Sequence, residues 1–214
     1  MASGGSFVKR IAEPAARLEQ GLAQLGLDSA LREPLLIYLL ELQKWNAAYN
    51  LTAVRDPLEM VTRHLLDSLA VLPALQGLPR PLQRLIDVGS GAGLPGIPLA
   101  LARPDWQVDV LDSNGKKARF LRHAVRTLGL RNAQVLEMRA EDCEPDQPYD
   151  GVISRAFSAL GAFVASTGHL LTPQGYWLAM KGRVDENESS GLSPHACIDE
   201  IVALTVPGLA EQRH

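Results

Sequence analysis

A glycine-rich stretch behind a short apolar run constrains the fold of this chain more than any other feature. The apolar run at residues 85–88 ends in three glycines at alternate positions, Gly89, Gly91 and Gly93. A helix-like apolar segment then begins at Leu94. Glycine has no Cβ atom, so such a stretch can turn sharply and approach a ligand closely. A strand, a glycine turn and a helix in this order predict the first unit of a ligand-binding α/β sheet.

The chain beyond this loop alternates short apolar runs with helical patterns. Further strands are predicted at residues 107–111, 133–138, 149–153, 175–180 and 198–206. Helical spacing predicts helices at residues 94–102, 115–129 and 158–171. Strands that alternate with helices indicate βαβ units, so we expect an α/β fold with a mostly parallel, doubly wound sheet.

The first third of the chain has a different pattern. Apolar residues at helical spacing predict helices at residues 8–26, 30–48 and 57–75. The stretch 76–83 contains glycine and prolines and is typical of a linker. We therefore expect a helical N-terminal extension over residues 1–76 and a cofactor-binding domain over residues 77–214.

Two cofactors fit the glycine loop. Residues 91–96 match the G-x-G-x-x-G fingerprint of dinucleotide binding, which would indicate an NAD-dependent oxidoreductase or a non-catalytic nucleotide-binding module. The acidic Asp87, two residues before the first glycine, gives a D-x-G-x-G-x-G form that resembles the first motif of class I methyltransferases. Pro95 and Pro98 remove N–H donors that a pyrophosphate would need at a helix start, whereas S-adenosylmethionine has no phosphate.

Asp112 ends the second predicted strand, 21 residues after Gly91. A carboxylate at this place can accept hydrogen bonds from both ribose hydroxyls of a bound nucleoside. This role fits NAD and S-adenosylmethionine equally well. The alternative is that Asp112 is the N-cap of the helix predicted at 115–129.

Composition and charge narrow the function classes. With 214 residues, 46% hydrophobic and 21% charged, the chain is an ordinary globular protein. We expect a cytoplasmic protein without a membrane span, since no apolar run is long enough, no secretory leader is visible, and the two cysteines make no disulfide framework. The net charge is −3, but residues 60–131 carry a net +5 and residues 132–200 a net −7. This asymmetry would steer a polyanion, or it only solvates helix faces.

A series of ordered motifs extends over roughly residues 35–213. The first motifs are Trp45-Asn46, Tyr49-Asn50-Leu51-Thr52, VRDPLEM, Arg63-His64 and Leu66-Asp67-Ser68. The later motifs are IDVGSGAGLPGIPLA, Val110-Leu111-Asp112-Ser113, Lys116-Lys117 with Phe120-Leu121, Arg139-Ala140-Glu141, Val152-Ile153-Ser154-Arg155-Ala156-Phe157 and Met180-Lys181-Gly182. Together they resemble one known family, the 16S rRNA guanine-N7 methyltransferases, also called glucose-inhibited division protein B or RsmG.

The resemblance implies a Rossmann-like class I methyltransferase that methylates N7 of a guanine in small-subunit ribosomal RNA. By family match, the cofactor would contact Gly89, Leu94, Ala140, Glu141 and Arg155. Together with the residues chosen from the motif itself, the expected cofactor-binding set is Asp87, Gly89, Gly91, Gly93, Leu94, Asp112, Ala140, Glu141 and Arg155. Methylation of a small molecule or a protein remains an alternative.

N7 chemistry needs positioning groups more than catalytic bases, because guanine N7 has an in-plane lone pair and no proton. We therefore expect no catalytic base, with Arg155 as a candidate for positioning. The sequence also lacks a Pro-Cys nucleophile pair and an Asn-Pro-Pro-aromatic run, which C5-methylating and amino-methylating enzymes carry. Phe157 could stack on a base or pack in the core.

Basic residues on and near the helix at 115–129 are candidates for binding RNA phosphates. The predicted RNA-binding set is Lys116, Lys117, Arg119, Arg122, Arg126 and Lys181. A solvated helix face is the alternative for the arginines. The expected partner is small-subunit ribosomal RNA or the ribosomal subunit, bound by a monomer without a metal ion. His64 and Asp67, three residues apart, are expected to pair and to fasten the N-terminal helices to the cofactor domain.

The chain departs from the family at its end. Family members continue past a Glu-x-x-His sequence with a short apolar strand, the last of the sheet, whereas this sequence ends at His214. We therefore expect the final strand to be missing and the strand at 198–206 to expose an edge.

Overall fold

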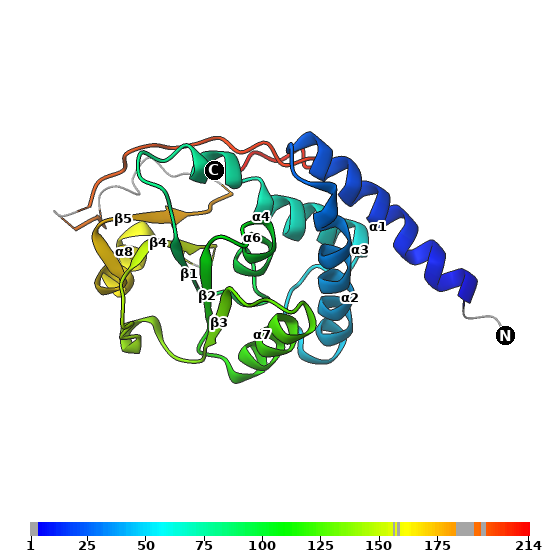
Figure 1. Cartoon of the computed structure of the whole chain (residues 1–214), viewed down its shortest axis with the longest axis horizontal. Coiled ribbons are helices and arrows are strands. Elements are labelled where there is room, and N and C mark those ends of the chain that lie inside the picture. The colour runs from blue at the N-terminus through cyan, green and yellow to red at the C-terminus, as the bar shows by residue number, and fades with distance from the viewer. Residues whose placement is uncertain (1–3, 156, 158, 183–190, 194–195) are drawn as a thin grey trace.

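A single five-stranded sheet organises the computed structural model (Figure 1). The structure describes residues 4–155, 157, 159–182, 191–193 and 196–214. The strands are β1 (Arg84–Val88), β2 (Gln107–Leu111), β3 (Ala133–Leu136), β4 (Tyr149–Ser154) and β5 (Leu171–Ala179). Their order is β3-β2-β1-β4-β5 and every pairing is parallel. The predicted doubly wound α/β fold is confirmed, and the carboxyl ends of all five strands share one edge.

Alternate side chains of the strands face two separate hydrophobic clusters, because successive residues of a strand point to opposite faces. On one face, Leu85 and Val108 pack with residues of α6 (Gly96–Ala102) and α7 (Gly115–Thr127). On the other face, Ile86 packs with residues of α8 (Leu160–Thr167) and the short turn η4 (Gly168–Leu170) that follows it. Both faces of the sheet are therefore covered, as a parallel sheet requires.

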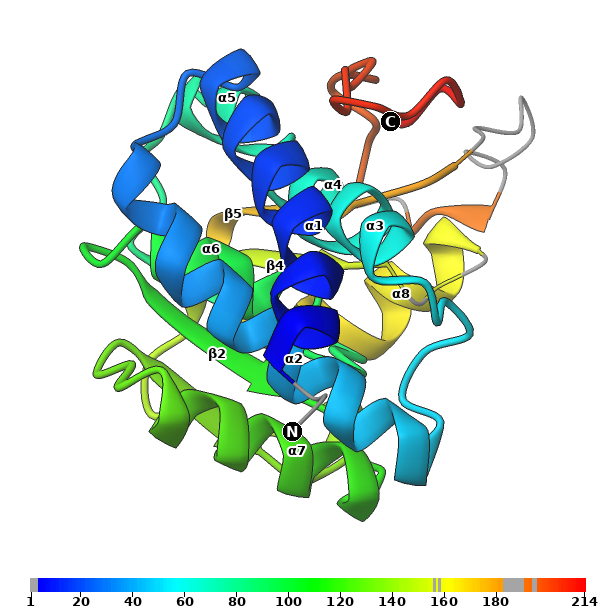
Figure 2. The same ribbon diagram turned by 90° about the vertical axis from the view of Figure 1, so that its right-hand side faces the viewer.

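The N-terminal helices form an outer layer over α6 and α7 (Figure 2). They are α1 (Gly4–Gln24), η1 (Ser29–Leu31), α2 (Arg32–Tyr49), α3 (Pro57–Met60), η2 (Val61–Leu66), α4 (Asp67–Leu69) and α5 (Leu72–Gln76). The chain leaves α2 through Asn50, which has a φ of 51°, and enters α3 after Asp56, whose carboxylate accepts a hydrogen bond from Glu59 N–H.

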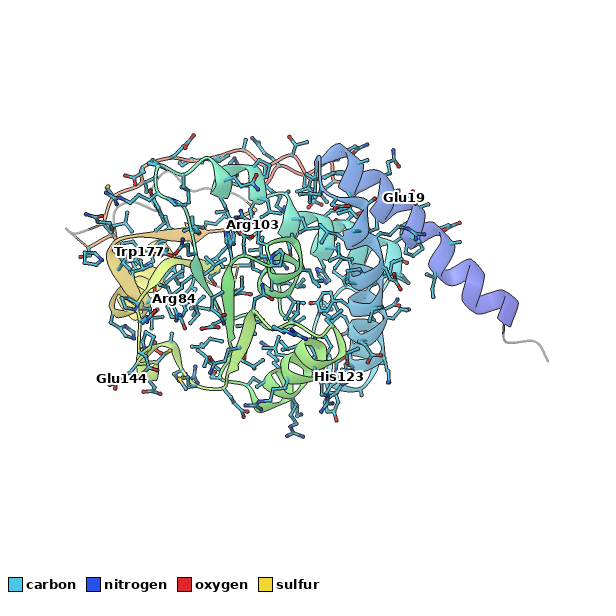
Figure 3. The ribbon with its side chains drawn as sticks, viewed as in Figure 1. Glu19, Arg84, Arg103, His123, Glu144 and Trp177 are labelled. Carbon is cyan, nitrogen blue, oxygen red and sulfur yellow. The ribbon has the colours of Figure 1, made fainter. Side chains whose placement is uncertain are left out.

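The two parts of the chain share one core. Leu18 and Leu42 from the N-terminal helices belong to the same buried cluster as Leu85 and Phe120. The ring of His123 on α7 lies beside α2 (Figure 3), with its Nε2 2.6 Å from Glu41 Oε2. The division into domains at residues 76 and 77 stays a prediction, and one continuous core crosses it.

Several predicted elements differ from the structure in kind or extent. Residues 57–75 are not one helix but the sequence α3, η2, α4 and α5, in which η2 is π-helical. Strand β5 begins at Leu171, four residues earlier than the predicted 175, and its pairing with β4 shifts register between Tyr149 and Gly151. Strand β3 ends at Leu136 instead of residue 138, and the short turn η3 (Ala140–Asp142) follows it.

The predicted strand at 198–206 is wrong. Only Leu204 in this range forms a bridge, an antiparallel one with Arg213. His214 in turn exchanges two backbone hydrogen bonds with Lys181, of 2.8 and 2.9 Å. Residues 213–214 thus lie between the end of β5 and Leu204. Apolar residues such as Ile201, 54% exposed, do not make a strand without a continuous partner.

Candidate active site

The glycine loop turns over the carboxyl ends of β1 and β2. The φ angles of Gly89, Gly91 and Gly93 are +71°, +61° and +89°. A Cβ atom on Gly93 would lie 2.6 Å from Cγ1 of Ile97, so both conformation and space require glycine there. The loop is bound to β2, because Leu111 O accepts hydrogen bonds from Gly89 N–H and from Ser90 N–H.

Asp87 lies beneath the loop and braces it. Its Oδ2 accepts hydrogen bonds from Ser90 Oγ at 2.6 Å and from Gly96 N–H at 2.9 Å. The side chain is fully buried, and this burial raises the pKa of Asp87 to about 6. The sequence predicted that Asp87 contacts a cofactor. With no exposed atom, we assign it to supporting the loop and the start of α6.

Asp112 stands beside the loop at the end of β2. Its Oδ2 accepts a hydrogen bond from Gly91 N–H and its Oδ1 one from Asn114 N–H, both of 2.9 Å. Lys117 Nζ is 3.5 Å from the same Oδ2. The N-cap of α7 is Asn114, whose Oδ1 accepts from two N–H groups of the first turn. The N-cap alternative for Asp112 is therefore wrong, and its carboxylate stays at the strand ends.

Arg155 follows β4 and enters the site from the opposite side. Its Nη1 is 2.8 Å from Oδ2 of Asp67, whose side chain is 8% exposed. Arg213 Nε lies 3.4 Å from the other oxygen, Asp67 Oδ1. Burial raises the pKa of Asp67, and the positive charges of Arg155 and Arg213 oppose that rise. The buried carboxylate thus holds the Arg155 side chain in place.

The expected pair of His64 and Asp67 is wrong. His64 Nε2 lies 2.8 Å from Thr52 Oγ1, whereas Asp67 binds the two arginines. His64 belongs to the π-helical η2, where residues three apart do not share a face as they do in an α-helix. Burial is the main cause that lowers the pKa of His64 to about 4, and the charge of Arg155 adds to it.

These groups meet around a pocket of about 200 Å³ at the carboxyl edge of the sheet. Its lining residues are Leu51, Thr52, His64, Gly89, Ser90, Gly91, Ala92, Leu94 and Arg155. Among the predicted cofactor residues, Asp112, Ala140 and Glu141 lie at the ends of neighbouring strands but not in the lining. Ala140 is buried in η3 and Glu141 is exposed. Gly93 is buried within the loop itself, and Asp87 is buried beneath it.

Sequence reasoning missed two side chains that shape this pocket. Tyr38 of α2 is buried and donates its hydroxyl to Ala92 O in the glycine loop. Asn46, also on α2 and 2% exposed, bonds the loop that carries Thr52. Asn46 stands in the first quoted family motif, Trp45-Asn46, but a buried polar residue on a helix is not distinguishable by spacing alone.

The predicted RNA-binding residues do not form one cluster. Arg119, Arg122 and Arg126 are exposed along α7, and Arg122 pairs with Glu137 at 2.7 Å. An open groove of about 560 Å³ runs beside Arg122 and Arg126, towards the amino end of β3 and away from the glycine loop. Lys116 and Lys117 lie at the start of α7, near Asp112. Lys181 follows β5, at the other end of the strand order.

Phe157 packs in the core. Its ring centroid is 5.0 Å from that of Phe163, a fully buried residue of α8. It also packs against the hydrophobic cluster on that face of the sheet. Of the two roles left open by the sequence, core packing is the one that the structure supports.

Comparison with known proteins gives a consistent result. The family model described as rRNA small subunit methyltransferase G (GidB) matches residues 32–214. A ribosomal RNA small subunit methyltransferase G of Stenotrophomonas maltophilia is 54% identical over 203 residues, which cover 95% of this chain and 93% of that protein. The protein of the same name from Methylobacillus flagellatus is 52% identical over 200 residues, 92% of this chain and 94% of its own length.

Solved structures are more distant. A SAM dependent methyltransferase from Aquifex aeolicus is 23% identical, with 57% of this chain and 68% of that one covered and a TM-score of 0.46. Family membership rests on the sequence matches, which span nearly the whole chain at about half identity. The chain belongs to the rRNA small subunit methyltransferase G family.

Proposed function

We propose that this chain transfers a methyl group from S-adenosylmethionine to N7 of a guanine in small-subunit (16S) ribosomal RNA. It would act as a monomer in the cytoplasm, on the RNA or on the ribosomal subunit. Membership of a family named for methylation of small-subunit rRNA supports the substrate. The target atom comes from the motif resemblance, and the geometry of the pocket supports the cofactor.

The observation that supports S-adenosylmethionine is that the backbone N–H groups around the start of α6 already donate hydrogen bonds within the protein. Gly96 N–H donates to Asp87, and Ile97 N–H donates to Gly93 O. Gly93 and Leu94 N–H both donate to Ser90 O, and prolines 95 and 98 have no N–H. A dinucleotide needs free N–H groups here for its pyrophosphate. S-adenosylmethionine carries no phosphate, so this closed helix start favours it over NAD.

The residues that would hold the cofactor follow from their places around the loop. Asp112 would accept the ribose hydroxyls, since each carboxylate oxygen has a second lone pair beyond its present hydrogen bond. Gly89, Gly91 and Leu94 would contact the cofactor through the loop that lines the pocket. Ala140, Glu141 and Arg155 complete the set from the ends of β3 and β4.

Methyl transfer to N7 requires alignment of the reacting atoms and does not require a general base. Bound S-adenosylmethionine supplies a sulfonium methyl group, which guanine N7 attacks with its lone pair while the carbon–sulfur bond breaks towards sulfur. Since N7 carries no proton, no side chain has to remove one before the transfer. His64, with a pKa of about 4, is a neutral and weak base at pH 7. Arg155, fixed by Asp67, is available to position the reactants.

The basic residues on α7 and its start would bind RNA phosphates. Arg119, Arg122 and Arg126 lie on an exposed face, where several cations can contact a polyanion without a cost of burial. Lys116 and Lys117 extend this face towards the pocket, and Lys181 approaches the same sheet edge from β5. RNA bound along α7 would thus reach the carboxyl edge of the sheet.

The test is a map of N7-methylguanine in small-subunit ribosomal RNA. RNA from cells with and without this protein is cleaved chemically at N7-methylguanine and compared position by position. We expect one position to lose its methyl group without the protein and to regain it when the wild-type chain is restored. Calorimetry with S-adenosylhomocysteine and NAD should show binding of the first only. An unchanged methylation map, or binding of NAD alone, contradicts the proposal.

A further inference from the structure

Besides Arg155, the pocket has two walls, and only one of them belongs to the glycine loop. The second wall consists of Leu51, Thr52 and His64, which come from the N-terminal part of the chain. A cofactor held by the glycine loop would leave this second wall facing the methyl group. A methyl acceptor that enters the pocket on this side would then contact these three residues.

The second wall is held rigidly by Asn46. Its Oδ1 accepts a hydrogen bond from Thr52 N–H at 2.9 Å, and its Nδ2 donates one to Val54 O at 3.2 Å. Asn46 itself is 2% exposed, so these bonds form where water does not compete. The backbone of residues 52 to 54 is thus tied to α2, and the Thr52 side chain lines the pocket.

The Thr52 hydroxyl can donate a hydrogen bond to a ligand in the pocket. Its Oγ1 accepts a hydrogen bond from Val54 N–H at 3.2 Å and lies 2.8 Å from His64 Nε2. The two neutral forms of the His64 ring differ in which nitrogen carries the hydrogen, and an acceptor bound in the pocket would favour the form with the hydrogen on Nε2. The ring then donates to Oγ1, and the hydroxyl hydrogen of Thr52 remains for a ligand in the pocket.

We infer that this second wall binds the acceptor guanine and that the Thr52 hydroxyl donates a hydrogen bond to guanine O6. The inference rests on the proposed function, because it takes guanine as the base. O6 neighbours N7 on the same edge of guanine, so a base that presents N7 in a pocket of about 200 Å³ also brings O6 to its polar lining. Adenine carries an amino group in that place, and two donors would then face each other. Thr52 would thus select guanine.

The experiment removes the donor and its acceptor separately. Thr52→Val removes the hydroxyl at nearly constant volume, and small-subunit particles carry either guanine or 2-aminopurine at the methylated position. 2-Aminopurine keeps N7 and lacks O6. In single-turnover methylation with labelled S-adenosylmethionine, we expect Thr52→Val to slow transfer to guanine about tenfold to a hundredfold. On 2-aminopurine, the variant and the wild type should react at equal rates.

Three controls separate recognition from damage to the fold. Thr52→Ser keeps the hydroxyl and should react within a few-fold of the wild-type rate. Thr127 is an exposed threonine on α7, and Thr127→Val should react at the wild-type rate. Affinity for S-adenosylhomocysteine should not change in any variant. A Thr52→Val rate equal to wild type on guanine overturns the inference, as does an equal loss on both bases. If the wild type forms no N7-methylguanine at all, the proposed function fails and not this assignment alone.

Discussion

The glycine loop and the C-terminal segment, residues 196–214, are both irregular, yet they are held by different forces. The loop is fixed by buried hydrogen bonds to Asp87, to Asp112 and to β2. The segment is held by one bridge, by the Lys181–His214 pair, by the contact of Arg213 with Asp67 and by exposed ion pairs such as Arg63–Glu211, with Val206 as a buried anchor. Exposed ion pairs contribute little each, whereas a broken buried bond leaves an unsatisfied group. We therefore expect the loop to tolerate substitution far less than the segment.

The largest difference is expected between two glycines with positive φ. Gly93→Ala in the loop should lower the free energy of unfolding by about 2–5 kcal/mol, the sum of left-handed strain and overpacking against Ile97. Gly208→Ala in the C-terminal segment should cost about 1–2 kcal/mol, the left-handed strain alone. Its new Cβ would come closest to the movable end of Arg17, with Thr62 Oγ1 at an ordinary contact distance of 3.6 Å. Urea unfolding measures both, and equal losses would remove the contrast.

Cofactor affinity should separate two acidic residues in the same way. Asp112→Ala should weaken binding of S-adenosylhomocysteine by about 1.5–3 kcal/mol, because charged hydrogen bonds to the ribose are lost. Glu211→Ala, which breaks exposed ion pairs in the C-terminal segment, should leave that affinity unchanged. Calorimetry is the measurement. Wild-type affinity in Asp112→Ala would refute the ribose assignment, and circular dichroism would show whether the fold is intact.

The buried carboxyl beneath the loop should make stability depend on pH. The pKa of Asp87 is about 6 in the fold, above its unfolded value near 3.9, so it stabilises the fold while protonated. That contribution, at most about 3 kcal/mol, is lost as the pH rises from about 4 to about 6. Asp87→Asn removes this loss. Between pH 4 and 6 the free energy of unfolding should therefore fall less for Asp87→Asn than for the wild type.

The exposed counterpart for that measurement is Glu211. Its pKa is lowered by Arg63, but the group lies in solvent. Unfolding curves of Glu211→Gln between pH 4 and 6 should run parallel to those of the wild type. A parallel curve for Asp87→Asn as well would mean that burial of the Asp87 carboxyl does not act on stability.

The smallest effect is expected on the exposed face of α7. Neutralising Arg119, Arg122 and Arg126 together should weaken RNA binding and reduce the slope of log affinity against log salt by about two to three. The fold and the affinity for S-adenosylhomocysteine should not change, since none of the three side chains is buried. Arg80→Gln, exposed near the amino end of β1, is the matched single control. An unchanged slope would leave these arginines as a solvated face only.

Local features of the sequence predicted the fold well, and features that depend on distant partners were not predictable. The bounds of strands β1, β2 and β4 lie within one residue of the predicted runs, because an apolar run between turn residues is enough to predict a strand. The run at 198–206 looked alike, but a strand exists only where a partner strand pairs with it. The π-helical η2 also escaped prediction, since its pattern of apolar residues resembles that of an α-helix.

The same distinction between local and distant partners applies to the candidate site. The glycine loop and Asp112 follow from residues close together in the chain. The Asp67–Arg155 pair joins positions 88 residues apart, and the bond from Tyr38 to Ala92 spans 54. Spacing rules describe neighbours on one element, so they suggested His64 as the partner of Asp67, in place of Arg155, which follows β4.

The bond from the Tyr38 hydroxyl to Ala92 bears on the modularity of the chain. The N-terminal helices carry the phenol that steadies the glycine loop, the amide that shapes the second wall, and the carboxylate that directs Arg155. Helices from an unrelated protein could therefore not replace them without loss of the protein's activity. A graft that preserved only the length and amphipathicity of these helices would leave the sheet intact and the pocket half built. The pocket in this enzyme is therefore built by both parts of the chain, and its boundary does not follow the boundary between helices and sheet.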